Sequence, residues 1–428
     1  MTQEKKKQGL YVGYDLCDDR TQIYYCREGQ SEPKVIGDDT KREKDHESEM
    51  IPTVLARKNK KDEWLFGHAA KAAEKDEETT IYRDFIGKLA DSESEFNQNP
   101  EFAVSLLVVF FRKTLRLLKI AVPNETITRM IVTTDHLTGT LVSSMYAALQ
   151  ELGINRDRVS IVSHERCYMY YVASFEGLEY NRVSVLFDYT KQGMFYHIMN
   201  TGKQNTSYRV QLESNDASGV IPFSMSETKD SSLASAFENM AGSLLYRRNV
   251  SSAYITGCGF EEGWLEPVLQ RLCQNGRVRI YAGDNLYAMG ACFGARDCGG
   301  NGSLSKNTFY SGESVKYSIY IDGYQNAMEK QEYLVEAGTA WYDVRTSRQL
   351  LLDGKRSIEM NVCDSTGKRM GSFQFPFTGI NKRPSRMTRI ELRIFFTDPD
   401  TLIVQGKDMG FGSVYPSSRR IWEETVKI

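Results

Sequence analysis

The sequence predicts an α/β domain followed by an all-β domain, with a glycine-rich segment between them. Within residues 1–297, short apolar runs alternate with segments whose apolar residues recur at helical spacing, which is typical of α/β proteins. Beyond residue 312, apolar residues recur at every second position and turn residues separate the runs, which is typical of a β-sandwich. Residues 298–312 have the composition of a flexible linker. We therefore expect domains at 1–297 and 313–428.

The expected elements of the α/β part follow from apolar runs and their spacing. Residues 101–119 place apolar side chains on one helical face, and residues 138–152 repeat that spacing before a stop at Gly153. The other expected elements, in chain order, are a strand at 130–134, a strand at 159–162 with a helix from 165, a hairpin of 183–188 with 194–199, and strand–helix units at 253–273 and 277–295. The sequence shows no internal repeat.

The β part is predicted to hold about eight strands. Apolar side chains alternate with polar ones along 315–321, 358–362, 373–377 and 390–394. Glycine and aspartate turns separate these runs, and no helical spacing appears among them. The alternation indicates sheets with one buried and one exposed face.

Composition and charge exclude several classes of protein. Hydrophobic residues make up 41% and aromatic residues 11% of the chain, which excludes disorder over most of its length. The net charge of −2 provides no overall field that would attract nucleic acid or an anionic membrane. The longest nearly uncharged apolar stretch, residues 103–111, is far shorter than the roughly 18 residues of a membrane span. We therefore expect neither nucleic acid nor a membrane as a partner.

The cysteines and histidines indicate a reducing compartment and no zinc site. The eight cysteines form no CxxC pair and are expected to be buried thiols. The N-terminal segment has no cleavable apolar core, so we expect a cytoplasmic protein. The five histidines are spread singly, which disfavours zinc.

Four strand-end turns carry the candidate functional residues. Asp15 and Asp188 each lie at the turn of a predicted hairpin, and two such hairpins facing each other would cradle a phosphate chain and its hydrated Mg²⁺. Gly257 and Gly259 follow a strand and precede a helix. Glu165 lies at a strand-to-helix junction. Asp15 and Asp188 are thus the predicted Mg²⁺ ligands.

The order and spacing of these turns resemble the nucleotide-binding half of the heat-shock protein 70 family, within the actin-like ATPase superfamily with its ribonuclease H-like fold. Segment 51–73 resembles the family segment with the catalytic lysine, here Lys71. Segment 149–174 is similar to the passage that bears the active-site glutamate, here Glu165. Segment 283–295 resembles the final connecting helix, with Gly290 at a close helix crossing.

The all-β part resembles the peptide-binding β-sandwich of the same family. Segments 332–349, 371–380 and 389–412 follow the order of that domain, and the last combines a strand, an Asp turn, a strand and the motif KDMGFG. The resemblance implies that an extended peptide or protein segment is the partner. The family's helical lid has no counterpart after residue 428, so we expect a bound peptide to dissociate quickly.

The predicted phosphate turns depart from the family pattern. Cys17, Asp18 and Asp19 stand where glycine and threonine bind phosphate, and carboxylates there would repel a polyanion. Tyr189 and Lys191 occupy the second turn, where glycine leaves space for phosphate; Lys191 could replace lost donors by its charge. Asp18, Lys191, Gly257, Gly259 and Gly290 complete the set of candidate nucleotide-contacting residues.

These observations favour a divergent heat-shock-protein-70-like pseudo-ATPase. It would bind ATP or ADP with Mg²⁺ weakly or not at all, and would act as a chaperone-like or partner-binding module. One alternative is an active ATPase in which Asp15 and Asp188 position Mg²⁺ and water, Lys71 stabilises the transferring phosphoryl group, and Glu165 completes the site. The other alternative is a structural subunit of a larger assembly.

Overall fold

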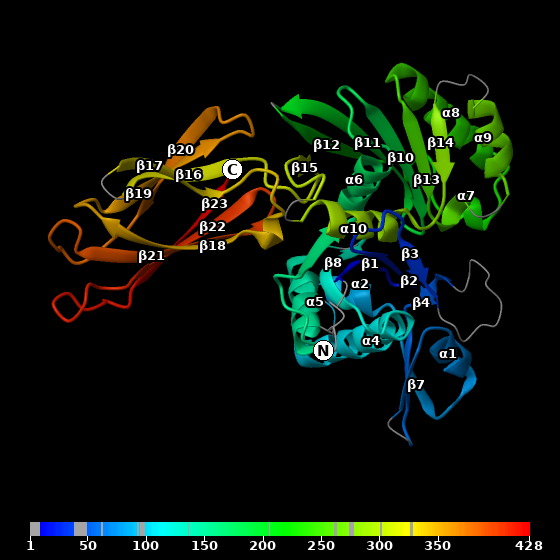
Figure 1. The fold of residues 1–428 in the computed structure, drawn as a ribbon, viewed down its shortest axis with the longest axis horizontal. Coiled ribbons are helices and arrows are strands. Elements are labelled where there is room, and N and C mark those ends of the chain that lie inside the picture. The colour runs from blue at the N-terminus through cyan, green and yellow to red at the C-terminus, as the bar shows by residue number, and fades with distance from the viewer. Residues whose placement is uncertain are drawn as a thin grey trace, which may run out of the picture. The chain divides into compact units, whose positions relative to one another are not determined.

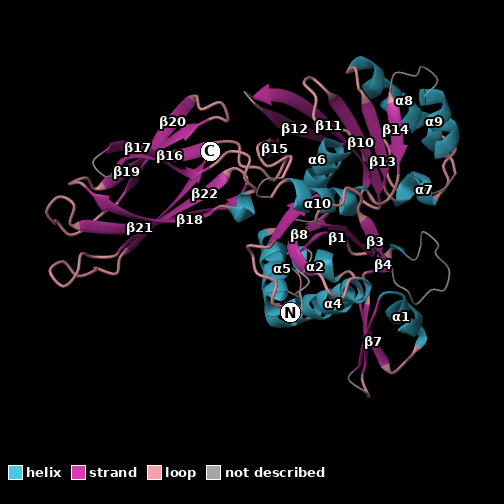
Figure 2. Cartoon of the chain, viewed as in Figure 1, coloured by secondary structure: helices cyan, strands magenta, loops and turns pink. Residues whose placement is uncertain are grey.

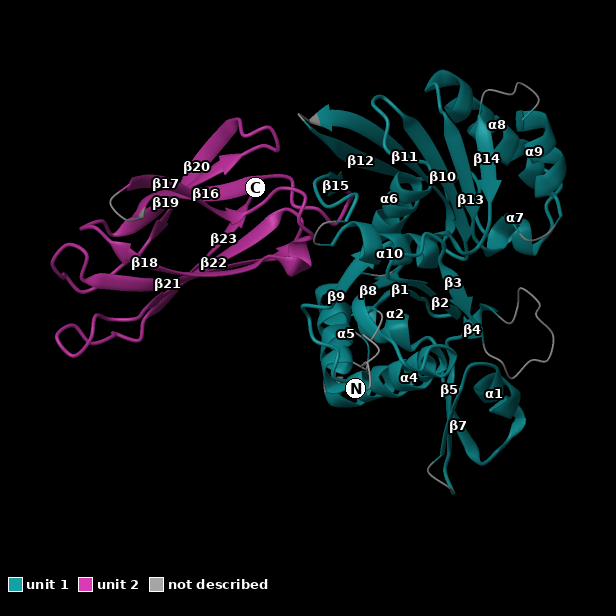
Figure 3. Ribbon diagram, viewed as in Figure 1, with its two compact units in different colours: residues 1–309 teal, residues 310–428 magenta. Residues whose placement is uncertain are grey.

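The computed structural model divides the chain into two compact units, residues 1–309 and residues 310–428 (Figure 3). The unit boundary falls inside the segment predicted as a linker. The structure describes the following residues: 9–37, 49–60, 63–91, 94, 99–135, 137–204, 206–260, 263–273, 278–299, 302–325 and 328–428.

The first sheet of unit 1 has the strand order β3-β2-β1-β8-β9, and β4 also pairs with β2. Strands β1, β2 and β3 are antiparallel neighbours, whereas β8 and β9 run parallel to β1. The bounds are β1 Gly9–Leu16, β2 Arg20–Arg27, β3 Lys34–Ile36, β4 Ile51–Pro52, β8 Thr126–Thr134 and β9 Val159–Ser163. The carboxyl ends of β1, β8 and β9 therefore meet at one edge of the sheet.

The second sheet repeats this topology in the order β14-β13-β10-β11-β12-β15. Its bounds are β10 Val183–Thr190, β11 Gly193–Gln204, β12 Ser207–Asp216, β13 Ser252–Thr256, β14 Arg279–Ala282 and β15 Thr308–Tyr310. Strands β10, β11 and β12 form an antiparallel meander, and β13 and β14 run parallel to β10. The two sheets therefore share one strand order, although the sequence shows no internal repeat.

Helices α6 (His164–Phe175) and α10 (Leu286–Asp297) lie between the two sheets (Figure 1). Helix α6 follows β9 of the first sheet but packs on the second, with Tyr168 and Met169 in one core with Leu186 and Met199. Helix α10 follows β14 of the second sheet but packs on β1 and β8 of the first. The helices cross closely at Gly290, where a Cβ atom would lie 2.1 Å from the Cys167 carbonyl oxygen. This confirms the predicted helix crossing at Gly290.

Further helices cover the outer surfaces of unit 1 (Figure 2). The predicted helices at 101–119 and 138–152 are confirmed as α4 and α5, each with a side-chain N-cap, from Asn99 and Thr138 respectively. Helix α8, which packs on the second sheet, was not predicted. The bounds are α2 Phe85–Ala90, α4 Pro100–Ala121, α5 Gly139–Glu151, α7 Ser224–Glu227, α8 Leu233–Arg247 and α9 Leu265–Cys273; a three-stranded sheet, β6-β5-β7 (Glu63–Phe66, Leu55–Lys58, Thr79–Tyr82), carries α1 Gly67–Ala72.

The predicted flexible linker at 298–312 is wrong for residues 302–309. Leu304 and Phe309 are buried in the core around α6, and the ring of Phe309 meets Tyr170 edge to face at 5.1 Å. Strand β15 extends the second sheet beside β12. Two apolar side chains within this glycine-rich segment therefore pack into the core of unit 1.

Unit 2 consists of two four-stranded antiparallel sheets, β17-β16-β19-β20 and β18-β21-β22-β23. Their inward side chains share one core, which includes Ile319, Met360, Phe375 and Leu402. The bounds are β16 Ser318–Gln325, β17 Met328–Val335, β18 Arg345–Leu352, β19 Ser357–Cys363, β20 Arg369–Pro376, β21 Thr388–Asp398, β22 Thr401–Asp408 and β23 Ile421–Lys427. The strict alternation of the sequence follows from this two-layer arrangement.

Two further observations concern the cysteines and membranes. All eight cysteines are free thiols, but the expected burial is wrong for Cys273, which is exposed, and for Cys258 and Cys298, which are half-buried. Among the described residues, no helix combines the length and the apolar character that a membrane crossing requires.

Candidate functional site

Asp15 and Asp188 occupy equivalent positions in the two sheets. Asp15 lies in β1 opposite Gln22, and Asp188 lies in β10 opposite Phe195. Both residues stand within their strands, not at the turns as predicted, because each strand continues beyond the aspartate. The repeated topology therefore places two carboxylates at corresponding ends of the two sheets.

Each carboxylate is hydrogen-bonded by a residue in the first turn of a central helix. The Nε2–H group of His164 donates to Asp15 Oδ1 at 2.8 Å, and the Tyr287 hydroxyl donates to Asp188 Oδ2 at 2.6 Å. The rings of His164 and Tyr287 stack, with centroids 3.8 Å apart and planes 9° from parallel. We call Asp15, His164, Tyr287 and Asp188 the aspartate bridge, because the two stacked rings connect the two carboxylates.

Burial and charge shift the pKa values within the aspartate bridge. Burial opposes protonation of His164, but the charge and hydrogen bond of Asp15, with the charges of Asp135 and Asp188, raise its pKa above the usual value. Burial raises the pKa of Asp188, against the lowering effect of the Tyr287 hydrogen bond. The second oxygen of Asp188, Oδ1, is buried without a hydrogen-bond partner in the described part of the chain.

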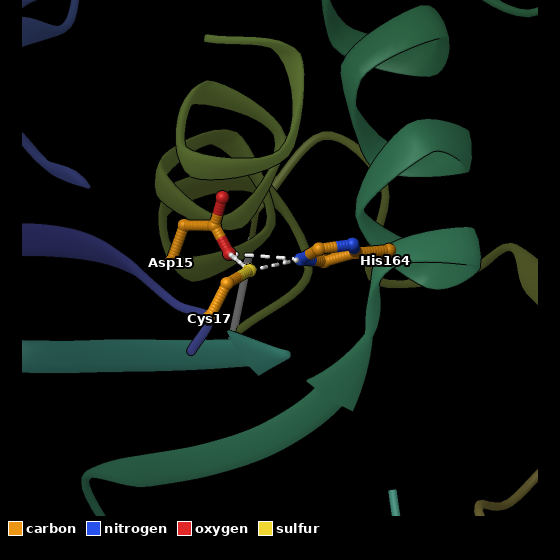
Figure 4. A group of neighbouring side chains, drawn as sticks. All are labelled: Asp15, Cys17 and His164. Atoms are coloured by element: carbon orange, nitrogen blue, oxygen red, sulfur yellow. Dashed lines mark hydrogen bonds and ion pairs between the residues drawn. The ribbon is translucent and has the colours of Figure 1, made fainter. Parts of the chain in front are cut away.

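Cys17 joins the aspartate bridge at Asp15 (Figure 4). Its Sγ atom lies 3.4 Å from Asp15 Oδ1 and 3.6 Å from His164 Nε2. Burial, followed by the charge of Asp15, raises the pKa of the Cys17 thiol well above its usual value. The sequence analysis missed both Cys17 and His164 as site residues. The signal was that Cys17 follows β1 and His164 follows β9, two strands that run parallel in the same sheet.

Asp18 is engaged with helix α2. Its carboxylate accepts hydrogen bonds from the backbone N–H groups of Ile86 and Gly87 at 3.0–3.1 Å. These are early N–H groups of the helix, and its N-cap residue, Asp84, provides no side-chain hydrogen bond. The predicted nucleotide-contacting residue Asp18 therefore caps α2 from a distance in sequence.

An Asp18→Ala variant is expected to lose about 0.5–2 kcal/mol of folding free energy, as for other helix caps. Asp19 provides the matched control, since its side chain is exposed on the same turn. Urea unfolding followed by circular dichroism checks the difference between Asp18→Ala and Asp19→Ala. Equal stability of the two variants would contradict the capping role.

Gly257 and Gly259 accommodate Tyr189. A Cβ atom on Gly257, whose φ is +109°, would lie 2.4 Å from the Tyr189 carbonyl oxygen. A Cβ atom on Gly259 would lie 2.2 Å from the Tyr189 ring. Tyr189 is fully buried, and its hydroxyl donates to the Pro222 carbonyl. The close approach that glycine permits at this turn is therefore made by the chain's own tyrosine.

Glu165 contacts two residues of the second sheet that the sequence analysis did not single out. The Ser214 hydroxyl donates to Glu165 Oε1 at 2.5 Å, and His197 Nδ1 lies 2.9 Å from that hydroxyl. Nδ1 of His197 also lies 3.8 Å from Glu165 Oε1. Burial lowers the pKa of His197 despite the charges of Glu165 and Asp188. The Glu165 side chain is thus directed from α6 toward β11 and β12 of the second sheet.

The two predicted lysines are exposed. Lys71 lies on α1, and Lys191 lies in the turn between β10 and β11. Among the described residues, no hydrogen bond or ion pair joins either lysine to Asp15 or Asp188. In the turn that bears Lys191, the Gln192 side chain instead reaches Asp135 Oδ2 at 3.5 Å. The structure therefore does not bring the predicted lysines into contact with the aspartate bridge.

Comparisons with known proteins give two matches. A model described as "Family of unknown function (DUF5716) C-terminal" matches residues 38–313, and a model described as "Domain of unknown function (DUF8552)" matches residues 314–428. The junction of the two matches lies close to the boundary between the two units. No curated protein matches the chain. Asp15 and Cys17 precede the first matched segment, whereas His164, Asp188 and Tyr287 lie inside it.

Proposed function

The chain belongs to the DUF5716 C-terminal family of unknown function, and from its site geometry we propose that it is a divergent heat-shock-protein-70-like pseudo-ATPase. In this proposal unit 1 is an actin-like ATPase domain that no longer binds nucleotide. Unit 2 is a chaperone-like β-sandwich that binds a protein or an extended peptide. The free thiols support a cytoplasmic location.

The aspartate bridge is the observation that carries the proposal. Asp15 and Asp188 are the carboxylates that a hydrated Mg²⁺ would need, and both already accept hydrogen bonds from His164 and Tyr287. Hydrogen bonds to charged groups contribute about 1.5–3 kcal/mol each, so Mg²⁺ would have to replace two such bonds and separate the stacked rings. The internal contacts therefore compete with the nucleotide for the same groups.

The surrounding turns support the same conclusion. Phosphate binding needs backbone N–H groups that a ligand can approach closely. Here the first turn holds the buried Cys17 and fastens Asp18 to α2, and the third turn is filled by Tyr189. The duplicated strand order around α6 and α10 supports the actin-like assignment of the fold. These observations support the proposal that the chain keeps an ATPase-like scaffold but has lost the phosphate contacts of these turns.

Binding of Mg-ATP and Mg-ADP, measured by isothermal titration calorimetry at millimolar nucleotide, tests the proposed loss of nucleotide binding. The expected result is no saturable heat, and no increase in melting temperature when either nucleotide is added. Lys71→Ala is the matched control, because it removes the charge that an active ATPase would use. Micromolar binding by the wild-type protein that Lys71→Ala weakens would favour the active ATPase instead.

The proposed partner surface is an edge strand of unit 2. Strands β17, β20, β18 and β23 are the outer strands of the two sheets. An extended peptide can add to such a strand through main-chain hydrogen bonds. Fluorescence polarisation with a library of extended labelled peptides tests this part, and binding that is unchanged by ATP is the expected outcome.

A further inference from the structure

We propose that Asp15, Cys17 and His164 bind a zinc-type divalent metal ion at the end of β1. Three ligand atoms of different kinds converge there, namely Asp15 Oδ1, Cys17 Sγ and His164 Nε2 (Figure 4). All lie within 4.8 Å of one another, and they come from positions up to 149 residues apart in the chain. The fold, not local sequence, brings them together.

The separations of the three atoms suit tetrahedral coordination. With Zn–S near 2.3 Å and Zn–N or Zn–O near 2.0–2.1 Å, tetrahedral ligand atoms lie about 3.3–3.6 Å apart. The sulfur lies 3.4 Å from the carboxylate oxygen and 3.6 Å from the imidazole nitrogen. The 2.8 Å between Asp15 Oδ1 and His164 Nε2 is the length of their hydrogen bond, which coordination would open by about half an ångström. The thiol proton would be released, and His164 would bind the ion through Nε2 as the neutral tautomer that carries its proton on Nδ1.

The arrangement does not suit a cysteine nucleophile. In a catalytic triad the thiol and the carboxylate bind opposite nitrogens of the histidine, so that the carboxylate orients the base. Here Cys17 and Asp15 both meet Nε2 of His164. The sulfur, the carboxylate oxygen and Nε2 instead lie next to one another, as three ligand atoms around one metal ion do.

The charges around the three residues favour a cation. Asp15, Asp135 and Asp19 act on Cys17, and Asp135 and Asp188 also act on His164, while Arg20 is the opposing positive group. Thiolate and imidazole ligands favour zinc over Mg²⁺, which prefers oxygen. The ligand atoms therefore favour a zinc-type ion over the Mg²⁺ that was predicted at Asp15.

Three protein ligands leave a fourth position for water or for a small ligand, as in open zinc sites. Asp188, whose charge acts on His164, carries a buried oxygen, Oδ1, that lacks a hydrogen-bond donor in the described part of the chain. Buried polar atoms in native proteins nearly always find a partner. A metal-bound water is a donor of the kind that this oxygen lacks.

Cobalt(II) binding to the chelator-stripped full-length protein tests the proposal. We expect one cobalt ion per chain, thiolate-to-cobalt charge-transfer absorption in the near ultraviolet, and a higher melting temperature. Zinc, at one equivalent, should displace the cobalt and abolish the absorption. Cys17→Ser should lose the charge-transfer band, and His164→Gln should weaken metal affinity at least tenfold.

Cys26→Ser is the matched control, because Cys26 is also a buried thiol of the same hairpin but lies outside the cluster. This control should keep the band. A folded wild-type protein that binds no stoichiometric cobalt or zinc would overturn the proposal, and so would a band that persists in Cys17→Ser. The wild-type result decides even if a variant fails to fold. The inference does not rest on the proposed function, because metal binding is measured without nucleotide.

Discussion

Gly290→Ala is expected to cost about 3 kcal/mol or more of the stability of unit 1, at the upper end of overpacking effects. The added Cβ would lie 2.1 Å from the Cys167 carbonyl oxygen and 2.8 Å from its carbonyl carbon. Both atoms are backbone, so no side-chain rotation can relieve the contact, and α6 and α10 must move apart. Tyr287 lies one turn before Gly290 on α10, so the same movement would pull Tyr287 away from Asp188 and His164.

Chemical unfolding of Gly290→Ala, followed by tyrosine and tryptophan fluorescence, measures this loss. Gly219→Ala is the control, because a Cβ there has no neighbour within 4 Å. The control should remain within about 1 kcal/mol of the wild-type protein. Wild-type stability in Gly290→Ala would show that the two helices do not cross as closely as described.

Arg383→Met is expected to destabilise unit 2 by about 3–5 kcal/mol, because it leaves Asp408 as an unpaired buried charge. Two Arg383 nitrogens donate to the two Asp408 oxygens at 2.8 and 2.7 Å. The Asp408 carboxylate also accepts hydrogen bonds from the backbone N–H groups of Gly410 and Ser418. The side chain of Asp408 is fully buried and that of Arg383 is only 3% exposed. Asp408 belongs to the KDMGFG motif, so this motif contributes the carboxylate of a buried ion pair in unit 2.

Lys316→Met is the control for the loss of an ion pair in the same unit. Lys316 and Asp400 are 2.7 Å apart but more than half exposed, so their separation should cost at most about 1 kcal/mol. Urea unfolding monitored by tryptophan fluorescence, to which Trp341 and Trp422 of unit 2 contribute, distinguishes the two variants. Equal losses would contradict the structural role of the buried pair.

The same pair predicts a dependence of stability on pH. Burial raises the pKa of Asp408, but the Arg383 hydrogen bonds and the Ser418 and Gly410 amides outweigh it and lower the pKa well below the usual value. A lowered folded pKa means that the stabilisation is complete above the unfolded value of about 3.9 and is lost as the pH falls through the folded value. Acid unfolding of wild-type unit 2 should therefore be steeper than that of Arg383→Met.

Local patterns were sufficient to predict many elements. Alternation predicted the strands around Ile319, Met360 and Leu392, and helical spacing predicted α4 and α5, because burial on one face leaves a direct periodic signal. Asp15 and Asp188 were recognised as a pair because each comes directly after an apolar run in a predicted hairpin. These features depend on neighbours in sequence.

The state of the site depends on contacts between distant residues and could not be predicted from the sequence. His164 bonds to a residue 149 positions away, and Tyr287 to one 99 positions away. Isolated histidines gave no reason to expect Cys17 and His164 in one cluster. Likewise, glycine-rich composition suggested a free linker, although Leu304 and Phe309 pack into a core formed by α6. Which side chains meet between the two sheets depends on how the strands and helices are connected, and not on patterns between neighbouring residues.

A crystal structure of the protein grown with millimolar Mg²⁺ and ADP tests the central claim most directly. The account predicts that the stacked rings of His164 and Tyr287 remain between Asp15 and Asp188, with Tyr189 against Gly257 and Gly259 and no nucleotide density. Density for ADP and Mg²⁺ between the two aspartates, with both rings displaced, would contradict it.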